Sequence, residues 1–145
     1  MASQVVLIGA FVACVLCCGV LGSGWGDPCT VIPGGNSLTE SGGEVTAPSN
    51  CTEGSVWWNY PRGTLQVNFH TDQNRPFTVC LTPSLGPLLN SVAQLYGGHR
   101  FAVRSPSEGE TVCLPRADTT VTAMLEQPNF QTYMTLYDFT LSFSN

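Results

Sequence analysis

Apolar and polar residues alternate along most of the chain beyond residue 50, as they do in strands that bury one face. In segment 64–70, Leu65, Val67 and Phe69 fall on one side. The same alternation recurs at 77–81, 101–103, 111–114, 120–126 and 131–143. Gly- and Pro-containing turns separate these segments, and only 85–96 leaves room for a helical turn. Seven or eight short strands of this kind predict an all-β sandwich of two antiparallel sheets.

The last of these segments changes its apolar parity. Met134 and Leu136 share one side, whereas Phe139 and the apolar residues after it fall on the other. A change of side within one strand is the mark of an extra residue in the ladder. The sequence therefore predicts a β-bulge near Tyr137 or Asp138.

Two adjacent tryptophans offer the most specific candidate for binding. Segments 56–60 and 64–70 flank a Pro-Arg-Gly turn, which predicts a hairpin. Alternation directs Trp58 into the core, against a disulfide, and Trp57 outward. An exposed tryptophan is a good binding anchor, so Trp57 is a candidate binding residue together with Arg62 in the turn. The alternative is that Trp57 packs beneath a loop or a glycan.

The amino terminus has the pattern of a secretory signal peptide. Residues 5–21 are uncharged and apolar, and the small residues Gly-Ser-Gly follow at 22–24. We expect residues 1–24 to be cleaved and residues 25–145 to form a single domain, secreted to the extracellular space without stable membrane insertion. Retention as a signal-anchor or a lipid-modified cysteine are the alternatives.

Removing the signal peptide reduces seven cysteines to four. An even number in an exported chain predicts two disulfides, with three connectivities open; the cysteines are Cys29, Cys51, Cys80 and Cys113. They include no C-x-x-C pair, so a zinc site has no support. Asn50 begins an Asn-Cys-Thr sequon and is the candidate glycosylation site.

Charge and motifs exclude several functions. Ten acidic residues oppose five basic ones, all arginines spread singly, and the net charge is −5. This excludes nucleic acid and weighs against anionic membranes as partners. His70 and His99 lie in separate segments, and no G-x-S-x-G, H-E-x-x-H or P-loop motif occurs. We expect no enzyme and no cofactor. Acidic residues leave calcium open, although no calcium-binding loop motif is present; they are Asp27, Glu40, Glu44, Glu53 and Asp72.

The middle of the chain resembles the amino-terminal domain of the meteorin and meteorin-like family. The resemblance rests on a cysteine, Gly-Ser, a tryptophan, Tyr-Pro-x-Gly and a strand ending in Val-Asn. The matching residues are Cys51, Gly54, Ser55, Trp58, Tyr60, Pro61, Gly63, Leu65, Val67 and Asn68, followed by Thr78-Val79-Cys80 and Val112-Cys113. It implies a CUB-like sandwich with Cys29 joined to Cys51 and Cys80 to Cys113.

The resemblance also implies a secreted, hormone-like role in cell signalling. The family continues into a second, netrin-like domain, so we expect this chain to be a single-domain relative. Its expected partner is a cell-surface receptor or an extracellular glycoprotein. The alternatives are a glycan- or matrix-binding module and, with the least support, an extracellular hydrolase.

Overall fold

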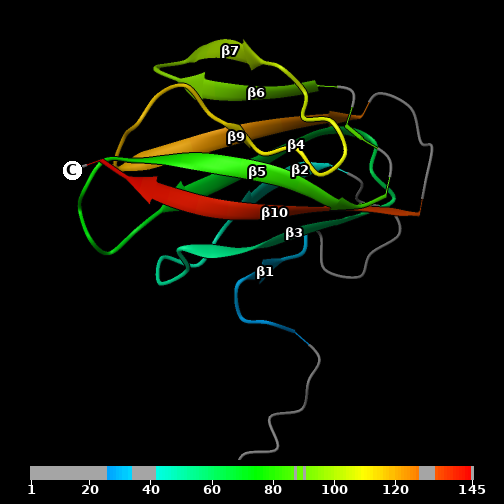
Figure 1. The fold of residues 1–145 in the computed structure, drawn as a ribbon, viewed down its shortest axis with the longest axis horizontal. Helices are drawn as coiled ribbons and strands as arrows, with labels where there is room; N and C mark the ends of the chain where they lie inside the picture. Colours follow the sequence, from blue (N-terminus) through cyan, green and yellow to red (C-terminus); the bar gives the residue numbers. More distant parts are fainter. Residues whose placement is uncertain (1–25, 34–41, 87, 90, 128–132, 145) are drawn as a thin grey trace, which may run out of the picture.

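The computed structural model describes residues 26–33, 42–86, 88–89, 91–127 and 133–144. The predicted signal peptide lies outside these residues. The described part of the chain folds into ten strands in two five-stranded sheets (Figure 1). Sheet A has the order β1 (Thr30–Val31), β3 (Glu53–Asn59), β10 (Met134–Phe143), β5 (Phe77–Leu85), β8 (Val112–Cys113). Sheet B has the order β2 (Gly43–Thr46), β4 (Gly63–His70), β9 (Thr120–Gln127), β6 (Ser91–Tyr96), β7 (His99–Val103).

The predicted all-β sandwich is confirmed, with one correction to its sheets. Neighbouring strands are antiparallel except at one edge of each sheet, where β1 runs parallel to β3 and β2 runs parallel to β4. Both sheets are therefore mixed. Neither short edge strand carries an alternation long enough to be recognised in the sequence.

Alternating apolar residues from the two sheets meet in one core. Leu65, Val67 and Phe69 of β4 are at most 1% exposed, as the alternation predicts. Phe69 packs against Phe139 of the opposite sheet with ring centroids 5.0 Å apart. Edge-to-face aromatic pairs of this kind stabilise a core beyond their buried area.

The predicted hairpin at 56–70 is wrong. β3 pairs with β1 and β10, whereas β4 pairs with β2 and β9. The Pro-Arg-Gly segment crosses from one sheet to the other. Tyr60, just before it, has φ of 47°, and Gly63, its last residue, has φ of 79°. Alternation shows which face of a strand is buried, but not which strand lies beside it.

Segment 85–96 contains no helical turn among its described residues. β5 continues to Leu85, Gly86 turns the chain with φ of 87°, and β6 follows from Ser91. β6 is covered on both faces over three consecutive buried residues, Val92, Ala93 and Gln94. A short buried strand of this kind lacks the alternation that would distinguish it from a helix.

The β-bulge predicted near Tyr137 or Asp138 is present at that level of the sheet, but it lies in β5, the strand beside β10. Leu136 pairs with Leu85, whereas the next residue, Tyr137, pairs with Pro83. Ser84 is thus the extra residue, and the bulge belongs to β5.

β10 itself keeps one parity throughout. Thr135, Tyr137 and Phe139 are buried, whereas Met134 and Leu136 lie on the outer side. The apparent change of parity arose because a buried threonine and a buried tyrosine alternate with two apolar residues on the outside.

Candidate functional site on the outer face of sheet A

The two tryptophans of β3 lie on opposite faces of sheet A. Trp58 is 1% exposed and belongs to the core, whereas Trp57 is 39% exposed on the outer face. Both predicted orientations are confirmed. The core cluster that contains Trp58 also contains Cys51, and Cys29 packs against it.

Trp57 is the first member of a row of large apolar side chains. Its register partner on β10 is Leu136, and the partner of Leu136 on β5 is Leu85. Register partners on one face of a sheet have Cβ atoms about 5 Å apart. We call Trp57, Leu136 and Leu85 the outer apolar row.

The row continues into a shallow hollow at the end of β5. This hollow has a volume of about 280 Å³ and is lined by Pro83, Ser84, Leu85, Gly86, Leu88 and Glu108. Leu85 is 50% exposed and Leu88 is 42% exposed. The bulge at Ser84 re-aims the end of β5, and it thereby turns Leu85 outward beside Leu136.

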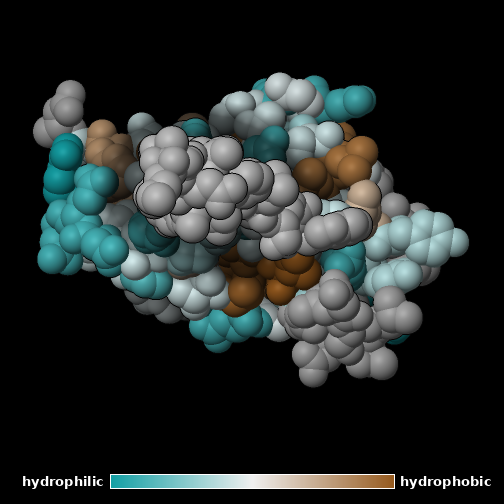
Figure 2. All heavy atoms as spheres, turned by 90° about the horizontal axis from the view of Figure 1, so that it is seen from below, coloured by the Kyte–Doolittle hydropathy of each residue, from teal (hydrophilic) through white to brown (hydrophobic). Residues whose placement is uncertain are grey.

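The neighbouring register row on the same outer face is polar. Ser55, Asp138 and Thr82 are register partners across β3, β10 and β5. Ser55 Oγ donates to Asp138 Oδ1 at 2.7 Å, and the hydroxyls of Thr82 and Thr111 are 2.7 Å apart. On the face seen from below in Figure 2, brown apolar residues lie in separate patches between teal polar ones.

The second candidate, Arg62, does not belong to the outer apolar row. It lies exposed in the segment that carries the chain from sheet A to sheet B. A role for Arg62 in binding stays a prediction. Leu85 and Leu136, by contrast, are not predicted as surface residues, because Leu85 begins the segment with room for a helical turn and Leu136 shares its side with Met134 before the predicted bulge.

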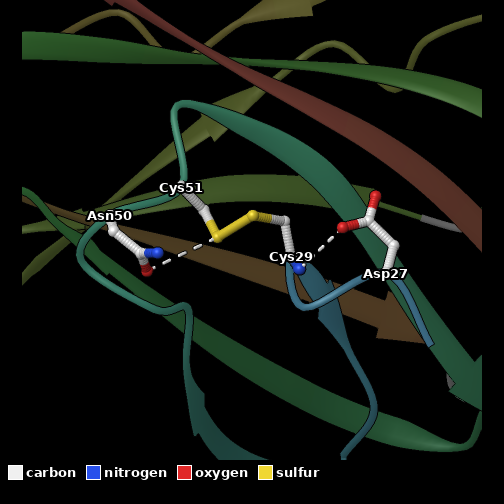
Figure 3. The surroundings of a disulfide bond; sticks show 4 residues. All are labelled: Asp27, Cys29, Asn50 and Cys51. Atoms are coloured by element: carbon white, nitrogen blue, oxygen red, sulfur yellow. Dashed lines mark hydrogen bonds between the residues drawn. A yellow bond between two sulfur atoms is a disulfide. The ribbon is translucent and has the colours of Figure 1, made fainter. Parts of the chain in front are cut away.

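The two disulfides join Cys29 to Cys51 and Cys80 to Cys113, which is the sequential pairing that the resemblance implied. The first joins the residue before β1 to the chain that enters β3 (Figure 3). Asp27 Oδ1 accepts a hydrogen bond from the Cys29 N–H at 2.9 Å and fixes the start of this segment. The second joins register partners on β5 and β8, at the edge of sheet A.

The sequon residue Asn50 lies exposed in a turn that is closed by a hydrogen bond from the Cys51 N–H to the Pro48 carbonyl. Asn50 Oδ1 is 3.9 Å from Sγ of Cys51 (Figure 3). This is a van der Waals contact, because a bridged sulfur has no proton to donate. Glycosylation of Asn50 stays a prediction.

Glu126 forms a structural pair with its neighbours on sheet B. Ser91 donates to Glu126 Oε2 at 2.5 Å, and Arg100 lies 2.7 Å from the same oxygen. These two partners hold the pKa of Glu126 below its usual value. His70 ends β4 and His99 begins β7, and both are exposed.

The described residues include no group of three or more His, Cys, Asp or Glu side chains that could hold a metal ion. They also contain no helix that is long and apolar enough to cross a membrane. Calcium stays an untested expectation.

The comparisons with known proteins point to the family that the central motif suggested. Meteorin of Rattus norvegicus is 35% identical over 86 residues, which are 54% of this chain and 29% of the relative. Meteorin of Mus musculus is 35% identical over 85 residues, which are 53% of this chain and 28% of the relative. The match thus spans less than a third of each relative. No protein-family model matches the chain. The predicted relationship to meteorin is confirmed over about half of this chain.

Proposed function

We propose that this chain is a secreted, non-enzymatic signalling domain that binds a cell-surface receptor or another extracellular glycoprotein through the outer apolar row. The similarity to meteorin supports a secreted, signalling-type protein. Two disulfides in a small all-β domain fit an oxidising, extracellular compartment.

The observation that carries the proposal is the outer apolar row itself. Trp57 and Leu85 remain 39% and 50% exposed although they stand side by side with Leu136 across three strands. Tryptophan is among the residues most often found as the energetic anchor of an interface. A polar row, of which Ser55 and Asp138 are part, borders it and would form the rim that such anchors have.

A glycan- or matrix-binding module is the second candidate. It is favoured by the exposed aromatic rings of Trp57 and Tyr133, the latter 77% exposed. Tyr133 packs edge-on against Tyr60 with centroids 6.0 Å apart, near the end of the same sheet. The two candidates make opposite predictions for cells from which surface glycans have been removed.

The test is saturable binding of the disulfide-intact protein to live cells, with and without calcium. Trp57→Ala and Leu85→Ser should each weaken binding by about tenfold or more, since anchor residues contribute about 2 kcal/mol or more. Thr140→Ala is the matched control, because Thr140 of β10 is exposed on the same outer face of sheet A but lies outside the row. We expect the control to bind as the unmodified protein does.

Two outcomes would overturn the proposal. Unchanged binding of both row variants would remove the outer apolar row as the contact surface. Loss of binding after enzymatic removal of cell-surface glycans would favour the glycan-binding alternative.

A further inference from the structure

Arg116 is held in an aromatic cradle at the far edge of sheet B. Its guanidinium carbon lies 4.6 Å from the ring centroid of Phe101 on β7 and 5.3 Å from that of Tyr96 on β6. The two rings are 6.4 Å apart and steeply inclined to one another. A guanidinium that contacts two aromatic rings is restrained by cation–π attraction while its N–H groups stay available.

The backbone of Arg116 is fixed as well. Gln94 is fully buried, and its side-chain amide donates to the Arg116 carbonyl at 2.8 Å and accepts from the Arg116 N–H at 2.9 Å. Both ends of the residue are therefore positioned before any ligand arrives. A ligand that meets a group ordered in this way pays little entropy for ordering it.

The guanidinium of Arg116 has no oxygen acceptor among the described residues, and the side chain is exposed. Three other arginines differ in this respect. Arg75 donates to the Ser144 carbonyl, Arg100 pairs with Glu126, and Arg104 pairs with Glu110. Arg116 is thus a positioned cation with its donors uncommitted, in a molecule of net charge −5.

The strand under this cation is an edge strand. β7 neighbours only β6 in sheet B, and Figure 1 shows it as the outermost strand of the fold. An edge of this kind presents unpaired backbone N–H and C=O groups, to which an extended segment adds as a further strand. An added strand would lie about 4.8 Å away, and its residue opposite Phe101 would have its Cβ about 5 Å from that of Phe101. The Arg116 guanidinium stacks on the ring of this same Phe101, 4.6 Å from its centroid.

We propose that the β7 edge and Arg116 together form a docking site for an extended segment of a protein partner, with an Asp or Glu opposite Phe101. The carboxylate would accept two parallel hydrogen bonds from the guanidinium, the geometry for which arginine is suited. A free strand edge favours a peptide over an acidic sugar, because only a peptide supplies a matching row of backbone donors and acceptors. The site lies on sheet B, so it is independent of the outer apolar row.

The test uses nuclear magnetic resonance of the isotope-labelled, disulfide-intact protein. The probe is the peptide acetyl-Thr-Val-Glu-Val-Thr-amide, and its partner probe has Gln in place of Glu. The Glu peptide should cause saturable shifts in the backbone amides of β7 and in the Arg116 Nε–H signal. The Gln peptide should bind about tenfold more weakly or worse, since it lacks the charge-assisted pair.

Two variants distinguish the effect of the Arg116 charge on peptide binding from an effect on the fold. Arg116→Gln should weaken the Glu peptide about tenfold and leave the Gln peptide unchanged. Arg75→Gln is the matched control. The Arg75 guanidinium carbon also lies over an aromatic ring, 5.6 Å from the centroid of Phe143, but this ring belongs to β10 of sheet A and not to the β7 edge. Near-ultraviolet circular dichroism checks that both variants keep the native packing.

Three results would overturn the proposal. The first is equal affinity of the Glu peptide for the protein and its Arg116→Gln variant. The second is a set of shifts that leaves β7 untouched. The third is a saturable response of Arg116 to sialyllactose without a response to either peptide, which would make the site one for acidic sugars.

Discussion

The side-chain amide of Gln94 is hydrogen-bonded at both of its ends to the backbone of Arg116. Nε2 donates to the carbonyl oxygen at 2.8 Å, and Oε1 accepts from the N–H at 2.9 Å. Gln94 lies on β6 and is fully buried, while Arg116 lies in the segment between β8 and β9. One core side chain thus fixes the backbone between Leu114 and Asp118, which are themselves hydrogen-bonded to Val79 and Phe77 of β5.

Replacing Gln94 by leucine should therefore destabilise the fold. The change leaves a backbone N–H and a backbone C=O of Arg116 without partners, and each such group costs about 1–3 kcal/mol. We expect the free energy of unfolding to fall by about 2–4 kcal/mol, measured by urea denaturation. Gln66→Leu on the outer side of β4 is the control and should change it by about 0.5 kcal/mol or less. Equal stability of the two variants would show that the hydrogen bonds to Arg116 do not contribute to the free energy of unfolding.

The neighbouring tryptophans give a second test of stability. Trp58→Ala empties a fully buried site and should lower the free energy of unfolding by about 3–5 kcal/mol. Trp57→Ala removes a side chain that is already 39% exposed, and should lower it by about 1 kcal/mol. Thermal and urea denaturation of both variants measure this difference. A larger loss for Trp57→Ala than for Trp58→Ala would contradict the assigned faces of β3.

The strands of the core were predictable because their alternation is a direct consequence of burial. Leu65, Val67 and Phe69 alternate with polar residues because one side of β4 faces the core and the other faces solvent. The sequon and the outward Trp57 are read from the sequence in the same local way. Each of these features depends only on the residue and its immediate neighbours.

What the sequence did not reveal depends on partners that are distant along the chain. Thr135 and Gln94 are polar but buried, since backbone groups of other segments satisfy them. Leu136 is apolar but faces outward, because its neighbours Leu85 and Trp57 share the surface with it. No single segment contains the information that sets these pairings, so the outer apolar row could not be foreseen.

The two disulfides should contribute unequally. Loops of 22 and 33 residues predict a similar entropic contribution of about 3–4 kcal/mol for each bridge. Cys51, however, is 2% exposed within the core, whereas Cys113 is exposed on short strand β8. We therefore expect the Cys29→Ala/Cys51→Ala variant to lose about 1 kcal/mol more than Cys80→Ala/Cys113→Ala, from the cavity left behind. Denaturation of the paired variants measures this, and the reverse order would contradict it.

Gly54, a residue of the family-like motif, lies on β3 against Cys29, the residue before β1. A Cβ at this position would clash with the Cys29 carbonyl oxygen and would be 2.8 Å from Cζ of Phe139. Gly54→Ala should therefore displace β1 and cost about 1–3 kcal/mol. The cost should shrink in the Cys29→Ala/Cys51→Ala background, because β1 is then free to move. Additive losses in a double-mutant cycle would show that the clash is not relieved through β1.

Tyr137 makes stability depend on pH at the alkaline end. Burial raises the pKa of its phenol above the ordinary value of 10.0, and the Leu89 N–H that donates to its oxygen at 3.0 Å offsets this only in part. Below pH 10 the phenol is protonated in both the folded and the unfolded chain and adds no pH dependence. Above about pH 10 the unfolded chain ionises first and binds fewer protons, so the free energy of unfolding falls as pH rises.

Tyr137→Phe isolates this effect. The variant should be about 1 kcal/mol less stable than the unmodified protein at pH 8, because the Leu89 N–H loses its acceptor. That difference should shrink as pH rises above 10, by at most about 1.4 kcal/mol per pH unit. Urea denaturation with intact disulfides between about pH 8 and 11.5 measures the two profiles. Absorbance at about 295 nm should show one phenol that resists ionisation in the folded protein and is missing from the variant. Parallel stability profiles would mean that the Tyr137 phenol ionises equally in the folded and unfolded chain.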